Sequence, residues 1–338
     1  MVTITDVARA AGVSTSTVSY VLSGKRTISQ QTKERVEQAI SELKYSPHAS
    51  ARSLASRSTN VIGLHAPLRS GVDVHIIMEI VAGMVREARA HHYDILLLTS
   101  DDASELSRVS RASMVDALLV MDVESDDPRI ALLKDLATPA LLIGLPAGAD
   151  GVPCVDFDFE TAGRLAASRL VELGHRRIAL LGAPAEVMTR QTSYSDRLGR
   201  GFLTEAQEAG VAASVHACPS TEDAVEVVDR LLSENPEITG ILFHNEGALP
   251  HVAGRLSTEE SGRVLDVIAL RPAGMAHTVS PLTDSIDLPA EELGAAAARA
   301  ILRFVDGEEQ PPVQLLAPHL ESAQALDDIS RGVTRRQP

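Results

Sequence analysis

The sequence has little of the chemistry that marks secreted, metal-binding or catalytic proteins. Its 338 residues include two cysteines, no tryptophan and only 3% aromatic residues. Cys154 and Cys218 stand far apart and outside any Cys-x-x-Cys or Cys/His spacing, so we expect neither a disulfide framework nor a zinc site, and predict that both are buried. The serine elbow, the P-loop and the His-Glu-x-x-His motif are also missing. We therefore expect no metal, no cofactor and no enzyme activity.

Long apolar runs are missing as well. No run approaches the roughly 18 residues that span a bilayer, and the N-terminal MVTITDVARAAG has neither a basic nor a continuous apolar segment. We expect a cytoplasmic protein with no membrane partner. The composition, 44% hydrophobic and 23% charged, is that of an ordinary globular protein. Because about 150 residues commonly share one core, the length predicts two or three domains.

Charge is unevenly distributed along the chain. A net charge of −15 would ordinarily argue against a polyanionic partner. Residues 1–60, however, hold eight Lys or Arg against four Asp or Glu, whereas the rest of the chain holds 23 against 42. A basic head on an acidic body can contact DNA through the head alone.

The first residues predict two short helices joined by a tight turn. Thr3 and Asp6 have the spacing of a capping box, so the first helix begins here, and Gly12 ends it in a left-handed conformation. Ser14 caps the second helix, whose Val18, Val21 and Leu22 are predicted to face inward. Its outward side chains are mainly hydroxyls: Thr15, Ser16, Thr17, Ser19 and Tyr20. Such residues lower helix propensity, so they indicate contact with phosphates and bases, the alternative being a solvated face.

A third helix and a weak fourth segment complete the head. Ser29 caps QQTKERVEQAISELKY, with Val36, Ala39, Ile40 and Leu43 as its core stripe. The HASARSLASRS that follows is too poor in apolar residues to fold alone. It could become helical on binding and place Ala51 and Leu54 in a DNA minor groove, or it could be a plain linker. We predict a helix-turn-helix domain over residues 1–46 and a hinge over 47–59.

The run ITDVARAAGVSTSTVSYVLSGKRTIS, followed by a Tyr-x-Pro-x-x-x-Ala-x-x-Leu hinge, resembles the lac-repressor/galactose-repressor (LacI/GalR) family of bacterial regulators. The resemblance implies a homodimer on a double-stranded, pseudo-palindromic operator, with the second helix in the major groove and paired Leu54 side chains kinking the operator centre. Thr15, Ser16 and Tyr20 would approach base edges. Tyr20 stands where arginine or histidine is commoner. The full predicted DNA-binding set is Thr3, Ser14, Thr15, Ser16, Thr17, Ser19, Tyr20, Lys25, Ile28, Ser29, Ala51 and Leu54.

From residue 60 short apolar runs alternate with amphipathic helices. Apolar runs without alternation are typical of strands covered on both faces, so the body is predicted to be α/β, with parallel sheets flanked by helices. The order of elements and LGHRRIALLG resemble the family's two-lobe, periplasmic-binding-protein-like body. We assign residues 60–320 to this effector-binding and dimerisation domain and 321–338 to a polar tail. Chain crossings between the lobes are expected near residues 285–289 and 159–163.

Ligands of open parallel sheets bind beyond the carboxyl ends of the strands. Strand ends and the family resemblance together give the predicted effector-binding set Pro67, Leu68, Arg69, Asp156, Arg197, Asn245, Arg271 and Asp287, with residues 99–101 and Asp122 as further strand-end candidates. Asn245 is the strongest single candidate. Arg197 precedes Gly201 by four residues where the family has three, and Arg271 replaces a usual aspartate. A stacked sugar would need Phe157, Phe159, Tyr194 or Phe243.

The sequence thus predicts a dimeric repressor that a small molecule, a sugar or an oligosaccharide, releases from DNA. Two alternatives stay open: a regulator that takes a non-sugar effector or a corepressor, and a solute-binding protein of a transporter. The second is disfavoured, because it requires export and the chain begins with the DNA-binding head instead of a signal peptide. For each polar candidate in the body, a solvated loop residue is the competing interpretation.

Overall fold

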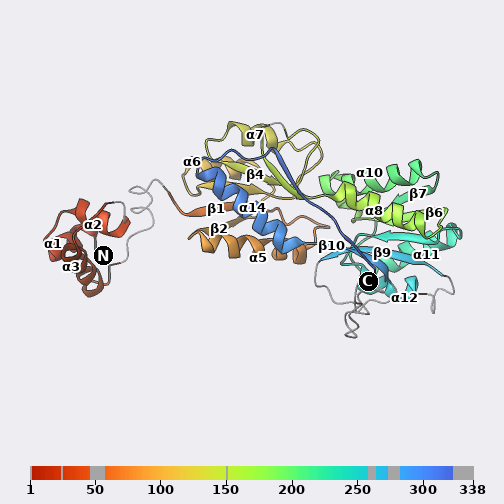
Figure 1. Cartoon of the computed structure of the whole chain (residues 1–338), viewed down its shortest axis with the longest axis horizontal. Coiled ribbons are helices and arrows are strands. Elements are labelled where there is room, and N and C mark those ends of the chain that lie inside the picture. The colour runs from red at the N-terminus through yellow and green to blue at the C-terminus, as the bar shows by residue number, and fades with distance from the viewer. Residues whose placement is uncertain are drawn as a thin grey trace, which may run out of the picture.

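The computed structural model describes residues 2–23, 26–45, 58–149, 151–257, 264–272 and 282–322. Figure 1 shows a small helical head at one end, a first lobe in the middle and a second lobe at the other end. None of the helices in these ranges is long and apolar enough to cross a membrane. The predicted Lys25, Ala51 and Leu54 lie outside the described residues.

The head has three helices, α1 (Ile4–Ala11), α2 (Thr15–Ser23) and α3 (Gln30–Glu42). The caps are as predicted: the Thr3 amide and hydroxyl donate to Asp6, Ser14 accepts from the Thr17 amide, and Gly12 has φ 62°. Its core is formed by Val7, Ala8, Ala11, Val18, Val36, Ala39 and Tyr45. One inward assignment was wrong, since Leu22 is 40% exposed. Tyr45, beyond the end of α3, fills the core instead.

The first lobe is a six-stranded parallel sheet in the order β11-β5-β4-β3-β1-β2. Its strands are β1 (Val61–His65), β2 (Asp94–Leu98), β3 (Ala117–Val120), β4 (Ala140–Ile143), β5 (Cys154–Phe157) and β11 (Val313–Leu316). Helices α5 (Val74–Ala90) and α14 (Ala290–Val305) cover one face, and α6 (Ser104–Arg111) and α7 (Arg129–Asp135) cover the other. Every residue of β3 and β4 is buried, as the continuous apolar runs predict.

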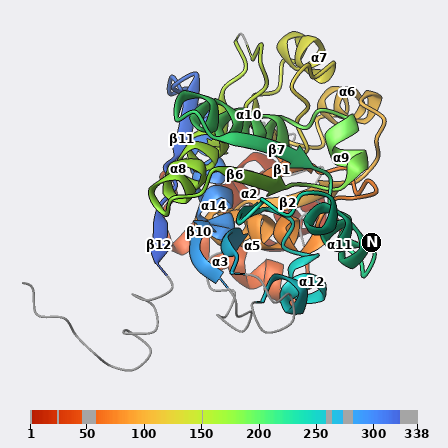
Figure 2. The same cartoon turned by 90° about the vertical axis from the view of Figure 1, so that its right-hand side faces the viewer.

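The second lobe repeats this plan in the order β12-β10-β9-β8-β6-β7, with only β12 antiparallel to its neighbour. Its strands are β6 (Arg177–Leu181), β7 (Ala212–His216), β8 (Gly240–Phe243), β9 (Asp266–Pro272), β10 (Leu282–Leu288) and β12 (Leu320–Ser322). Figure 2 shows α8 (Phe159–Glu172) and α10 (Ser193–Glu208) on one side of the sheet and α11 (Ala224–Glu234) and α12 (Leu249–Leu256) on the other. The short helix α9 (Ala185–Thr189) follows β6.

In each lobe a pair of glycines allows two helices to cross in close contact. A Cβ on Gly83 would lie 1.8 Å from the Glu291 carbonyl oxygen, and one on Gly294 would lie 1.9 Å from that of Ile80, so α5 and α14 touch backbone to backbone. In the second lobe Gly163 and Gly201 bring α8 and α10 equally close, with carbonyl oxygens 2.2 Å and 2.0 Å from the added Cβ atoms. Only glycine permits these approaches.

The chain crosses between the lobes three times. Two crossings, from β5 to α8 and from β10 to α14, lie at the edges of the predicted segments. The third, residues 317–319 between β11 and β12, was not predicted. The predicted polar tail from residue 321 therefore begins inside a strand, β12, that pairs with β10.

Candidate functional site

The carboxyl ends of both sheets face one cavity. In each lobe the chain runs from a central strand, β1 or β6, to one side and then to the other, and such switch points are where open α/β sheets bind ligands. A cavity of about 140 Å³ lies there, between the lobes. Its walls include Ala66 after β1 and Asp122 after β3 in the first lobe, and Ala183 after β6 and His244 after β8 in the second. A cavity of this volume accommodates one six-membered ring.

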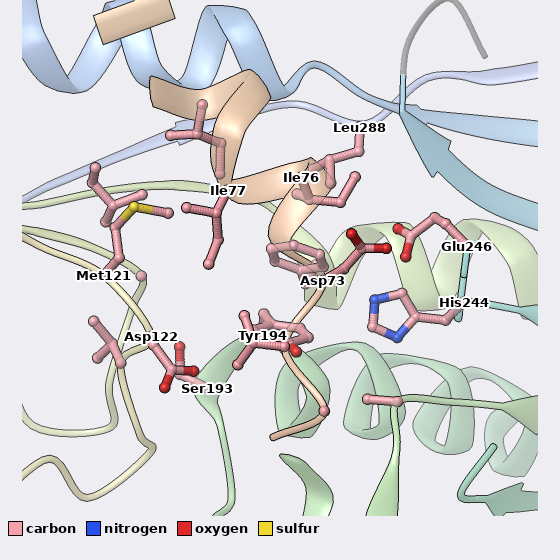
Figure 3. A pocket seen from close by; sticks show the side chains of 18 of the residues that line it. Asp73, Ile76, Ile77, Met121, Asp122, Ser193, Tyr194, His244, Glu246 and Leu288 are labelled. Carbon is pink, nitrogen blue, oxygen red and sulfur yellow. The ribbon is translucent and has the colours of Figure 1, made fainter. Parts of the chain in front are cut away.

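One wall of the cavity is apolar and the opposite end is polar. Figure 3 shows Ile76 and Ile77 of α5 on one side and Tyr194, His244 and Glu246 on the other. Of the four aromatic residues considered for stacking, Phe159 and Tyr194 line the cavity, with ring centroids 5.6 Å apart, whereas Phe157 and Phe243 are buried in the core of the second lobe.

Three predicted strand-end residues line the cavity: Asp122, Asp156 and Asn245. The Asn245 amide is already engaged, because its NH₂ group donates to the Cys218 carbonyl at 2.5 Å and its oxygen accepts from the Ser220 hydroxyl at 3.0 Å. These bonds fix the orientation of Asn245 and leave part of its hydrogen-bonding capacity for a ligand.

The predicted arginines do not line this cavity, because carboxylates hold them elsewhere. Arg69 binds Asp101 at 2.7 Å and Asp122 at 3.0 Å, Arg197 binds Asp156 at 2.6 Å, and Arg271 lies behind the wall, bonded to Ser285. Three further predicted residues also lie outside the cavity lining: Pro67 is buried, Leu68 is 49% exposed and Asp287 pairs with Arg271. These six residues therefore do not line the described cavity, and their part in effector binding stays a prediction.

Burial changes the proton affinity of the polar end. Desolvation lowers the pKa of His244 to about 4 and raises that of Glu246 to about 8, with a further increase from the Asp73 and Glu79 carboxylates. Burial also raises the pKa of Asp156, against the opposing effect of Arg197. His244 is therefore neutral at pH 7, and Glu246 holds its proton more tightly than an exposed glutamate does.

We expect Glu246 to give the folding stability a distinct pH dependence. Glu246 ionises near pH 4.5 when unfolded and near pH 8 when folded, so between these values the folded state holds more protons and a rising pH lowers the free energy of unfolding. Relative to Glu246→Gln, the wild type should lose up to about 1 kcal/mol per pH unit in this window, less where solvent reaches the carboxyl. Urea unfolding at several pH values measures it.

The exposed Glu226 of α11 provides the matched control, since Glu226→Gln should give a curve parallel to the wild type at every pH. His244 contributes the opposite slope below its unfolded pKa, but this cancels in the comparison because both proteins retain His244. If the free energies of unfolding of Glu246→Gln and the wild type differed by the same amount at every pH between the two pKa values, the assigned environment of Glu246 would be contradicted.

The two lobes are joined by contacts beside the cavity. Arg190, at the end of α9, reaches the first lobe, where it bonds the Asp122 carboxylate at 3.3 Å and the Ser70 carbonyl at 3.3 Å. The Ser125 hydroxyl of the first lobe donates to Asp196 of the second at 2.6 Å. Asp122 adopts a positive φ of 51°, which is uncommon for a residue with a side chain. These contacts between the lobes were not predicted from the sequence.

Most of the predicted DNA-contacting residues that the structure describes are exposed. Thr3, Thr15, Ser16 and Ser29 are exposed, Tyr20 is 37% exposed, and Ser14 is exposed while capping α2. Thr17, Ser19 and Ile28 are partly buried. The hydroxyls of Ser14 and Thr17 are hydrogen-bonded to each other at 2.9 Å, so each already uses part of its hydrogen-bonding capacity at the start of α2.

One candidate contact was missed. The Arg26 guanidinium lies over the Tyr20 ring, 5.6 Å from its centroid, and Arg26 is exposed. Tyr20 stands where arginine or histidine is commoner, and Arg26 provides a guanidinium beside it through a cation–π contact. The basic Gly-Lys-Arg run was the signal that could have identified it.

The fold and the cavity together define a two-lobe ligand-binding body joined to a helix-turn-helix head. Residues 3–48 match the family described as bacterial regulatory proteins, lacI family, and residues 69–324, more than half of the chain, match periplasmic binding proteins and sugar binding domain of LacI family. The chain therefore belongs to the LacI family. It is a sequence-specific DNA-binding transcription regulator and not an enzyme.

Similar proteins span nearly the whole chain. The HTH-type transcriptional regulator MalR of Streptococcus pneumoniae is 31% identical over 317 residues, which cover 90% of this chain and 93% of MalR. Among solved structures, a CelR–cellobiose complex is 26% identical with a TM-score of 0.64 and covers 96% of this chain and all of its own. A lac repressor dimer bound to operator and an anti-inducer is 24% identical, with a TM-score of 0.78, 95% coverage of this chain and 98% of its own.

Proposed function

We propose that this regulator is a cytoplasmic homodimeric repressor that binds a pseudo-palindromic operator through α2 and the hinge, and that a sugar bound between the lobes releases it. The observation that carries the proposal is the cavity at the carboxyl ends of both sheets, on a body attached to an exposed hydroxyl-rich helix. The cellobiose complex of CelR and the operator-bound lac repressor dimer support a sugar effector and a dimer.

Strand β3 provides a physical route from the cavity to the head. At its start, Asp116 accepts hydrogen bonds from Ser58, Thr59 and Asn60, the residues through which the hinge joins the first lobe. At its other end, Asp122 lines the cavity. A ligand that shifts the end of β3 would therefore move the point where the hinge is attached, and in a dimer would change the distance between two such points.

The test starts from genomic DNA fragments that the full chain selects by binding. We expect the selected fragments to be pseudo-palindromic and the complex to be released by at least one sugar in a fluorescence-anisotropy titration. Selection of no preferred sequence would contradict the operator assignment. Release by no sugar would contradict the effector assignment and favour the alternatives of a non-sugar effector or a corepressor.

Arg26 gives a sharper test of the DNA-reading face. We expect Arg26→Ala to weaken binding to the selected fragment by about tenfold or more and binding to unrelated DNA only slightly, because an arginine–guanine contact contributes roughly 1–3 kcal/mol of discrimination. Anisotropy titrations at two salt concentrations measure both affinities.

Arg35→Ala is the matched control for Arg26→Ala, since Arg35 is an exposed arginine of the same head on α3. Its loss should affect selected and unrelated DNA alike, through net charge alone. An equal loss on both kinds of DNA for Arg26→Ala would assign Arg26 to phosphate contact instead of base reading.

A further inference from the structure

The cavity is lined by acidic side chains without a basic one among its described residues. Its described lining includes four carboxylates, Asp73, Asp122, Asp156 and Glu246, and no lysine or arginine. Asp122 is paired with Arg69 and Arg190, and Asp156 with Arg197, all from behind the wall. The described walls of the cavity therefore provide no cation for the other two carboxyl groups, those of Asp73 and Glu246.

These two carboxylates belong to opposite lobes. Asp73 precedes α5 in the first lobe and accepts from the His75 amide at 2.8 Å, while Glu246 follows β8 in the second. Figure 3 shows both side chains at the same end of the pocket. Neither forms an ion pair within the described residues, and Asp73 disfavours ionisation of Glu246. Asp73 and Glu246 can therefore ionise together only at a cost, which a positive group between them would remove.

An unused imidazole lies at the same place. His244 lines the cavity and is only 6% exposed, yet its Nδ1 has no hydrogen-bond partner in the described part of the chain. Figure 3 shows its ring beside Tyr194 and Glu246. Because His244 is neutral, it cannot neutralise the carboxylates, but it can exchange a hydrogen bond with a polar ligand. A buried polar group without a partner is costly, which indicates that a ligand completes the site.

We propose that the interlobe cavity takes a single-ring ligand that carries a protonated amine, such as an amino sugar, with the amine between Asp73 and Glu246. The inference rests on the proposed function, whose effector it specifies. The ring lies against Ile76 and Ile77, and its hydroxyls reach Asn245 and His244. The amine stabilises the ionised form of both carboxyl groups, so that Glu246 releases its proton on binding, whereas a phosphorylated or carboxylated sugar would add negative charge beside them.

The experiment uses the full chain and measures thermal stabilisation and calorimetric affinity below the pKa of the amine. Glucosamine, galactosamine and mannosamine are compared with the corresponding hydroxyl sugars, the N-acetyl sugars and the 6-phosphates. We expect at least one amino sugar to bind about tenfold or more tightly than its uncharged counterparts, and the phosphates not to bind. Glu246→Gln and Asp73→Asn should each remove this preference, while the exposed control Glu226→Gln keeps it.

Any other order of the affinities contradicts the inference. If a neutral sugar binds best and releases the DNA, the proposed function stands and the amine is wrong. If no compound of any series stabilises the protein or releases the DNA, both the amine and the sugar effector fail, while DNA binding itself is judged by the selected fragments. A preference for amino sugars that survives both Glu246→Gln and Asp73→Asn would show that the carboxylates are not the recognition element.

Discussion

Gly294→Ala destabilises the protein by about 3 kcal/mol and lowers the yield of folded chain. The added methyl group would lie 1.9 Å from the Ile80 carbonyl oxygen and 3.1 Å from the Met84 amide nitrogen. These are backbone atoms of α5, so the clash can be relieved only by separating two helices that form one wall of the first lobe's core. Overpacking of this kind costs about 1–3 kcal/mol, and occasionally more. Urea unfolding of the purified variant measures the loss.

Gly199 of α10 is the matched control, because a Cβ there meets nothing within 4 Å. Gly199→Ala should leave the free energy of unfolding unchanged or raise it by about 0.5–1 kcal/mol, since alanine is the better helix former. Equal stability of the two alanine variants would contradict the close crossing of α5 and α14.

Arg197→Met is expected to destabilise the second lobe and its junction with the first by about 3–5 kcal/mol, which is typical when one partner of a buried ion pair is removed. Arg197 and Asp156 are 4% and 3% exposed, and the remaining carboxylate would have no counter-charge beside it. Burial already raises the pKa of Asp156. In the variant, proton uptake by Asp156 therefore offsets part of the loss of stability at low pH. The difference between the two free energies of unfolding should increase as the pH rises. Urea unfolding at two pH values measures it.

Arg200→Met on the same helix is the control. Arg200 also pairs with a carboxylate, that of Glu160 at 2.7 Å, but its side chain is 56% exposed. Exposed pairs contribute roughly 0–1 kcal/mol, so this variant should remain close to wild type at both pH values. A large loss for both variants would point to general disruption of α10 instead of the buried pair.

The parts of the fold that the sequence predicted are those with a local signal. Caps, the apolar stripe of α3 and the continuous apolar runs of β3 and β4 depend on neighbours in the chain, and the structure confirms them. Strand β7, AASVH, was missed because it is an edge strand whose residues are exposed or half-buried and carry little apolar pattern. The short edge strand β12 was missed for the same reason.

The cavity was predicted less completely than the fold. Strand ends pointed to Asp122, Asp156 and Asn245, because parallel sheets gather these ends in one place. The arginines lie outside the cavity lining, since a strand-end position does not reveal that a carboxylate distant in sequence will hold the side chain. His244 and Glu246 flank Asn245 after β8 but were not singled out, and Asp73, before α5, is not at a strand end. Their importance comes from their burial and from the contact between the two lobes, and local sequence predicts neither.

The route of the chain through the first lobe affects how the protein is made. Helix α14 contributes Leu293 and Ile301 to that lobe's core, and β11 forms the edge of its sheet, although both come from the last fifth of the chain. A ribosome therefore releases a head that can fold at once, while the first lobe stays incomplete until residue 316 has emerged. Proteins truncated late in synthesis would keep the DNA-reading helix without a finished sensor, and would be exposed to proteolysis before they could occupy an operator under effector control.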